Sequence, residues 1–118
     1  MPNANSLRTL CAAALLVPLA TLPTYAGALK GANGHTASGN ATINNAQVEL
    51  GADFAFDGGP DVYVAVRKDG EIHLLGKLRD NSGAQAYALP TDFSLGGNDE
   101  ILLFCKQYNV TLGKASAN

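Results

Sequence analysis

Residues 61–75 read DVYVAVRKDGEIHLL. The first half places a valine at every second position from Val62 to Val66, which is the pattern of a strand with one buried face. Asp69-Gly70 follows, a pair that two-residue hairpin turns favour, and residues 71–75 return as a second apolar run. The stretch therefore predicts an antiparallel hairpin.

Short strands of this kind are expected throughout the chain, separated by turns rich in Gly, Pro, Asn and Asp. Besides the hairpin, their expected ranges are residues 40–43, 47–50, 53–56, 84–89, 100–105 and 108–112. The run over residues 100–105 is almost continuously apolar, which is typical of a strand buried on both faces. About seven short strands with turns every 8–12 residues predict an all-β fold, a small antiparallel β-sandwich or barrel.

Three local expectations follow from the same patterns. Residues 27–39 are rich in Gly, Ala, Asn and Ser without periodicity, so we expect an entry segment there and no strand. Gly113 is expected to end the last strand. His73 lies between Ile72 and Leu74, and this alternation predicts that its side chain faces solvent.

The composition narrows the class of protein. The chain has 118 residues, of which 47% are hydrophobic, and a formal net charge of −2. That length suits one small domain, and the hydrophobic fraction argues against disorder. The negative net charge excludes a surface that is basic overall, of the kind that binds nucleic acid or an anionic membrane. No run reaches the roughly 18 consecutive apolar residues that a membrane span needs.

Residues 1–26 have the three-part pattern of a secretory signal peptide. Arg8 supplies positive charge, an apolar run follows, and small side chains ending at Ala26 precede a cleavage position before Gly27. We therefore expect a cleavable signal helix and, after it, a β domain over residues 27–118. The mature protein would be exported to the periplasm or the extracellular space, with no membrane span left after cleavage.

Cleavage before Gly27 would remove Cys11 and leave Cys105 as the only cysteine. An unpaired cysteine in an exported protein suggests a reactive thiol or an intermolecular link, because disulfides persist in that environment. The alternative is a buried thiol that fills core space as a small apolar group. Cys105 ends an apolar run and precedes polar Lys106, which places its sulfur near a strand end.

The common catalytic and nucleotide-binding motifs do not occur: G-x-S-x-G, the phosphate-binding loop with its lysine, and H-E-x-x-H are all absent. His35 and His73 with one mature cysteine cannot complete a four-ligand zinc site without carboxylates, so we expect no metal. Asp57-Gly58-Gly59 is similar to a fragment of a calcium loop but lacks its alternating oxygen ligands, so we expect a simple turn. These patterns assign no enzymatic activity.

Four blocks of sequence, in order, resemble the DM-thirteen domain, an extracytoplasmic domain often found beside DOMON and cytochrome-type redox modules. The blocks begin at Gly34-His35-Thr36-Ala37-Ser38-Gly39, at Val48-Glu49-Leu50, at Leu75-Gly76-Lys77-Leu78 and at Leu103-Phe104-Cys105-Lys106. Together they span almost the whole mature chain. Phe104 stands where many members have Trp, and Tyr108 and Leu112 stand where Phe is common, so the apolar character is kept.

The resemblance implies an all-β domain with a redox or electron-transfer role centred on Cys105, which matches the family's near-invariant cysteine. The role would be exercised through the bare thiol or through a bound group such as haem. His35, in the first block, is a second candidate, either as a group that assists the thiol or, like Cys105, as an axial haem ligand. Its alternative role is a hydrogen bond to a nearby backbone carbonyl. The absence of C-x-x-C-H excludes covalent haem attachment.

Two classes of function therefore stay open. The first is a small exported redox or electron-transfer domain that meets a protein redox partner through Cys105. The second is a non-catalytic β-sandwich for interaction or adhesion, in which Cys105 is a buried structural residue. Neither involves nucleic acid.

We predict that the exported form begins near Gly27, because residues 1–26 carry the export pattern. Amino-terminal sequencing or the intact mass of the exported protein measures this. Met1 retained on a folded, exported protein would contradict the prediction and make Cys11 available as a disulfide partner for Cys105.

Overall fold

The computed structural model describes residues 24–44, 46–96 and 98–116. The expected signal peptide over residues 1–26 lies outside them except for its last three residues. Every element of the described part is a strand, so this part holds no helix that could span a membrane. The strands are β1 (Thr24–Ala28), β2 (Lys30–Gly31), β3 (Ala37–Ser38), β4 (Asn40–Asn44), β5 (Gln47–Leu50), β6 (Ala55–Phe56), β7 (Val62–Lys68), β8 (Glu71–Lys77), β9 (Gln85–Ala88), β10 (Glu100–Cys105) and β11 (Val110–Ser116). The predicted all-β class is confirmed.

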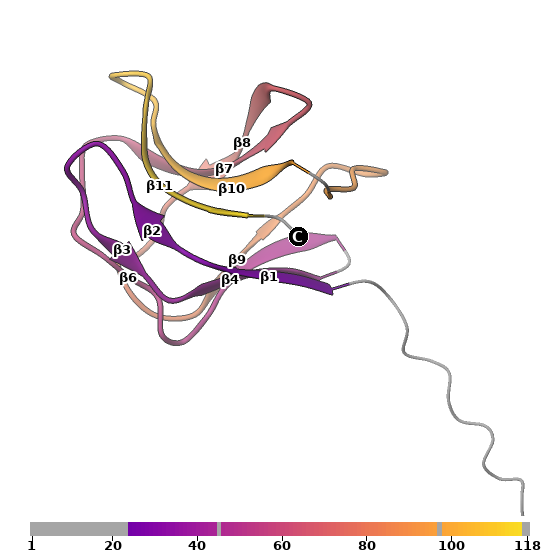
Figure 1. Cartoon of the computed structure of the whole chain (residues 1–118), viewed down its shortest axis with the longest axis horizontal. Coiled ribbons are helices and arrows are strands. Elements are labelled where there is room, and N and C mark those ends of the chain that lie inside the picture. The colour runs from indigo at the N-terminus through magenta and orange to yellow at the C-terminus, as the bar shows by residue number, and fades with distance from the viewer. Residues whose placement is uncertain (1–23, 45, 97, 117–118) are drawn as a thin grey trace, which may run out of the picture.

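Two sheets pack face to face as a sandwich (Figure 1). One sheet has four strands in the order β1-β4-β5-β9, and the other has five in the order β2-β11-β10-β7-β8. The short strands β3 and β6 form a separate two-stranded ladder. Neighbouring strands are antiparallel throughout, and apolar side chains from the inner faces of both large sheets form one core. Of the two architectures that the sequence predicted, a sandwich or a barrel, the fold is the antiparallel sandwich.

Strand β10 lies near the middle of the five-stranded sheet, between β11 and β7. Its residues after Glu100 are all buried, as the apolar run predicted. Ile101, Leu103 and Cys105 face the core between the sheets. Leu102 and Phe104 belong to a second, smaller apolar cluster, which therefore lies on the outer face of this sheet.

The β7–β8 hairpin forms as predicted. Asp69 and Gly70 have φ angles of 53° and 85°, the two left-handed positions that a type I′ turn requires. All residues with positive φ among the described ones, glycines apart, are Asn or Asp, whose short polar side chains tolerate this region best.

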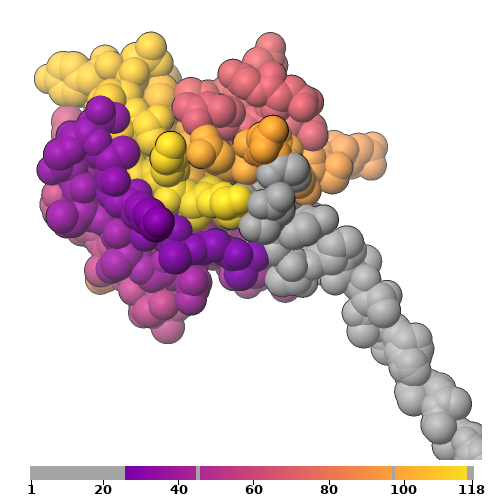
Figure 2. Space-filling model, viewed as in Figure 1, coloured from indigo at the N-terminus to yellow at the C-terminus, as the bar shows by residue number. Residues whose placement is uncertain are grey.

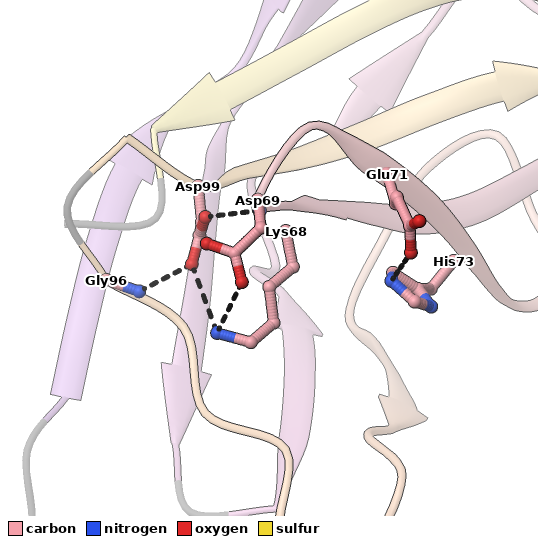
Figure 3. A network of polar contacts seen from close by, with 6 residues as sticks. All are labelled: Lys68, Asp69, Glu71, His73, Gly96 and Asp99. Carbon is pink, nitrogen blue, oxygen red and sulfur yellow. Dashed lines mark hydrogen bonds and ion pairs between the residues drawn. The ribbon is translucent and has the colours of Figure 1, made fainter.

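Asp99 fixes the tip of this hairpin (Figure 3). Its side chain is largely buried, and its two carboxylate oxygens accept hydrogen bonds from the backbone N–H groups of Asp69, at 3.2 Å, and Gly96, at 3.1 Å. The Lys68 ammonium lies 3.7 Å from the same carboxylate. Burial by itself would raise the pKa of Asp99, but the backbone hydrogen bonds and Lys68 outweigh it and lower this pKa below 3.8. The network ties the loop before β10 to the β7–β8 turn.

The expectation that residues 27–39 hold no strand is wrong. β1 pairs with β4 and β2 pairs with β11, so the chain crosses from one sheet to the other at the buried Leu29. The N-terminal strands, in indigo, therefore lie against the C-terminal strand, in yellow, in Figure 2. A Cβ at Gly31 would lie 1.8 Å from the carbonyl oxygen of His35, so only glycine allows this close approach. Strands as short as β2 and β3 show no detectable alternation in the sequence. The cleavage position expected before Gly27 lies within β1 and stays a prediction.

The expectation that Gly113 ends the last strand is also wrong, because β11 continues to Ser116. Gly113 lies inside the sheet, where an added Cβ would be 3.2 Å from Leu103 Cδ1 and 3.3 Å from Ala37 Cβ. Glycine here marks close packing between elements.

The prediction that His73 faces solvent is only partly correct, because the residue lies on the inner face of its sheet while 37% of its side chain stays exposed. It lies opposite Val66, an inner-face residue, and its ring packs edge-on against Phe93 with 5.0 Å between the ring centroids. Ile72 and Leu74 are the exposed residues of β8. Alternation separates the two faces of a strand, but it does not say which face is covered.

We predict that Asp69→Pro destabilises the protein by at least about 2 kcal/mol. Proline fixes φ near −65°, whereas Asp69 has a φ of 53°, and proline also lacks the N–H that Asp99 accepts. Urea unfolding measures the change. Asp69→Asn is the control, since Asn tolerates positive φ and keeps the N–H, and it should leave stability nearly unchanged. Equal stability of the two variants would contradict the turn described here.

We predict that the Asp99 carboxylate makes stability fall as the pH drops below about 4. A folded-state pKa below that of the unfolded chain means that Asp99 contributes stability above the unfolded pKa, and that this contribution is lost as the pH falls through the folded pKa. Asp99→Asn should remove this part of the pH dependence, measured as urea midpoints between about pH 2.5 and 6. An unchanged slope in Asp99→Asn would contradict the assignment.

Candidate functional site

Cys105 ends strand β10 and points into the core. It lies opposite Val62 of β7 and Val110 of β11, and only 1% of its surface is exposed. Its Sγ donates a hydrogen bond to the carbonyl oxygen of Pro60, 3.1 Å away. Cys105 is the only free cysteine in the part of the chain that the structure describes. The expectation of a strand-end thiol is correct in position, and the sulfur is covered.

The cover is the turn over residues 57–61, which connects β6 to β7. Gly58 and Asp61 adopt positive φ angles of 92° and 54°. The turn is held at both ends by backbone hydrogen bonds, from Asp57 N to Thr36 O at 3.1 Å and from Lys106 N to Asp61 O at 3.0 Å. Gly59 and Pro60 themselves are exposed, and Pro60 is the residue whose carbonyl oxygen binds the thiol, so the segment next to the sulfur reaches the protein surface.

His35 lies against the same turn. Its Nδ1 is 3.0 Å from Oδ1 of Asp57, and its ring stacks on Phe56 with centroids 5.9 Å apart. A Cβ at Gly59 would lie 3.5 Å from His35 Cε1 and 2.9 Å from Leu112 Cδ1, so glycine lets the imidazole and the core leucine close on the turn. His35 is thus bound to a carboxylate, where the sequence suggested a backbone carbonyl as the alternative to a functional role.

The Asp57 carboxyl is held ionised. Desolvation would raise its pKa, but the hydrogen bond with His35, two backbone hydrogen bonds and the His35 charge together lower this pKa below 3.8. An ionised carboxylate only accepts, so Nδ1 of His35 carries the proton in this pair. His35 Nε2 is left without a hydrogen bond to any described residue.

His35 and Cys105, the two residues singled out from the sequence, both contact the turn over residues 57–61 but do not contact each other through a hydrogen bond. His35 binds it through Asp57 and Gly59, and Cys105 binds it through Pro60. No hydrogen bond links His35 to Cys105 within the described residues. Asp57 and the Pro60 carbonyl are the partners that sequence reasoning missed. Asp57 was visible only as part of a turn signal, and it lies 22 positions from His35.

Haem does not fit this site with Cys105 as its ligand. The sulfur is buried in the core and is bound to a backbone carbonyl. The hollow beside His35 has a volume of about 270 Å³ and is lined by residues 36–38 and 55–57, without Cys105. That volume is below the range of about 300–1,000 Å³ usual for small-molecule sites. Among the described residues, no three His, Cys, Asp or Glu side chains gather into a group that could hold a metal ion.

A larger hollow, of about 620 Å³, lies at the other end of β7 and β10, between the β7–β8 turn and the loop before β10. Its polar lining includes Lys68, Asp69 and Asp99, which are already bound to one another or to nearby backbone. Those contacts account for its charged groups, so the end that carries Cys105 remains the candidate site.

Comparison with known proteins agrees with the resemblance found in the sequence. The family model described as "Electron transfer DM13" matches residues 29–117, from the sheet crossing at Leu29 through the whole of β11. No curated protein and no solved structure matches the chain. The match covers the turn over residues 57–61 together with His35 and Cys105. It also covers more than half of the chain, so this protein belongs to the DM13 electron-transfer domain family.

Proposed function

We propose that this chain is a small exported redox domain in which the Cys105 thiol carries out the electron transfer of its family. Membership of the electron-transfer family supports the redox role. We assign the electron transfer to Cys105 because of its position. It is the one free thiol of the described residues, and it lies at a strand end beneath an exposed turn. The signal pattern of residues 1–26 supports export to the periplasm or the extracellular space.

The reaction open to a single thiol is exchange with a disulfide of a partner protein. The Cys105 thiol gives its proton to solvent, and its sulfur attacks one sulfur of the partner disulfide. The partner S–S bond breaks as the new S–S bond to Cys105 forms, and the released partner sulfur takes up a proton. Cys105 is thereby oxidised to a mixed disulfide and the released sulfur is reduced to a thiol. A thiolate of a second protein then attacks the partner sulfur of the mixed disulfide. A new S–S bond forms between those two sulfurs, and the released Cys105 sulfur takes up a proton.

This reaction requires the turn over residues 57–61 to open. In the closed form, the Cys105 proton is donated to the Pro60 carbonyl, and a thiol whose proton is held in this way is a poor nucleophile. Opening would break that hydrogen bond and the His35–Asp57 pair, and it would leave both sheets in place. The turn would act as a guard that limits oxidation of the thiol until a partner displaces it.

The second candidate function is an interaction module with a purely structural cysteine. The burial of Cys105, at 1% exposed, and its satisfied hydrogen bond favour this reading. In this case the thiol fills core space beside Val62 and Val110, and the family's electron transfer would use another group.

The two candidates predict different labelling of the native protein. If the turn opens locally, iodoacetamide should alkylate Cys105 slowly, at a rate that changes little at low urea concentration, because local opening exposes little surface. Intact mass against time measures this. If Cys105 is structural, labelling requires global unfolding, and its rate should rise steeply with urea in proportion to the unfolding m-value.

Two histidine variants sharpen this experiment. His35→Ala removes the pair with Asp57 and the stacking on Phe56, so labelling should become roughly 3–10 times faster with little change in the global urea midpoint. His73→Ala is the matched control, because its ring packs on Phe93 away from the turn, and it should not change the labelling rate. Equal effects of both variants, or none from His35→Ala, would contradict a guarding turn.

A further inference from the structure

The outer face of the five-stranded sheet, which we call the basic face, carries an ordered array of side chains. Residues directly opposite each other in antiparallel strands share a face, so the pairing registers define its rows. Three rows cross the sheet from strand to strand. The middle row consists of Lys30, Lys114, Leu102, Ala65 and Leu74. The row on one side of it holds Glu100, Arg67 and Ile72, and the row on the other side holds Phe104, Tyr63 and Lys77. Lys106 lies over the Tyr63 ring, 5.7 Å from its centroid.

The centre of the basic face is apolar. Leu102, Ala65 and Phe104 form a buried floor that is separate from the main core. Ile72 and Leu74 extend it along β8, and they are 37% and 39% exposed, among the largest exposed aliphatic side chains that the structure describes. Figure 1 shows this sheet as one layer of the sandwich, with this face turned away from the other layer. An apolar centre with a charged rim is the usual anatomy of a protein–protein interface.

The rim is strongly basic, although the protein is acidic overall. Five of the seven Lys and Arg side chains in the described residues lie on or over this face: Lys30, Arg67, Lys77, Lys106 and Lys114. The acidic groups there are Glu100, paired with Arg67 and Lys114, and Asp61, paired with Lys77 at 3.5 Å. The other eight Asp and Glu lie in the other sheet, in loops or around the β7–β8 turn. The charge is therefore segregated, with an excess of three positive charges on this face.

We propose that the basic face docks an acidic partner protein whose own interface has an apolar centre. Charge complementarity selects the partner, because the excess positive charge would attract an acidic surface and orient the encounter. The apolar strip of Ile72 and Leu74 would then be covered by the partner. Phe104 adjoins Cys105 in β10, so docking here brings the partner to the strand that carries the thiol.

A protein suits this face better than a membrane or nucleic acid. Membrane-binding surfaces insert several aromatic or long aliphatic side chains, whereas here only Ile72 and Leu74 are exposed, each to less than two fifths, and Phe104 and Leu102 are covered. Nucleic acid favours a continuous basic stripe, whereas here apolar positions separate Lys114 from Arg67 and Lys77. The inference takes from the proposed function only the class of partner, an electron-transfer protein.

The test is a titration of the full chain with a plant-type ferredoxin, a strongly acidic electron-transfer protein, at low ionic strength. Calorimetry gives the Kd, and amide chemical shifts locate the surface. The shifts should fall on β7, β8, β10 and β11, and binding should weaken as salt is added. Lys77→Gln with Lys114→Gln should weaken binding about tenfold or more, and Leu74→Ser should weaken it without changing the salt dependence.

The matched control changes the net charge by the same amount elsewhere. Ala52→Glu with Ala88→Glu adds two negative charges at exposed positions outside the five-stranded sheet, and it should change the Kd less than about twofold. Cys105→Ala should bind as tightly as the original chain, so a failure of docking and a failure of thiol chemistry are distinguishable. The proposal is overturned if ferredoxin does not bind, if its shifts map to the other sheet, if the control weakens binding equally, or if phosphatidylserine vesicles or duplex DNA bind more tightly.

Discussion

The burial of β10 on both faces is the constraint on which the rest of the structure depends. Its inner side chains join the core between the two sheets, and its outer side chains form the second apolar cluster. A strand covered on both sides must be paired on both edges, and β7 and β11 supply those pairs. The same strand ends at Cys105 and presents Phe104 on the opposite face, so it positions both the candidate thiol and the basic face.

Irregular pairing around β10 shapes the site. The register shifts between Leu103 and Phe104 against β11, and the extra residue, Leu112, points into the core. Leu112 Cδ1 closes on Gly59, and the turn over residues 57–61 then lies across the end of β10. The thiol thus binds the backbone of this turn through the Pro60 carbonyl, and the His35–Asp57 pair holds the start of the same turn. A partner that displaces this turn would reach Cys105 without opening the sandwich.

Much of the fold follows from local patterns in the sequence, and the exceptions have physical causes. β5 and β10 match their expected ranges, because alternation and continuous apolarity report burial directly. β2 and β3 were not predicted, since two residues are too few to show alternation. β1 was missed because its first three residues were assigned to the signal peptide and Gly27 carries no side chain to extend a pattern. Cys105 was identified as the unpaired cysteine and by the family resemblance, and His35 by the resemblance alone. Their common turn depends on contacts between residues far apart in the chain. Neither the burial of the sulfur nor the Asp57 partner of His35 could be read from local spacing.

If the proposed function is correct, the Cys105 sulfur exchanges with a disulfide while the sandwich stays folded. Incubation of the native protein with oxidised glutathione, without denaturant, tests it most directly, with intact mass to detect the adduct and circular dichroism to follow the fold. We expect a mixed disulfide between Cys105 and glutathione that forms while the β signal is unchanged and that reduced glutathione reverses. An adduct that forms only when the protein unfolds would contradict the claim and assign Cys105 a structural role.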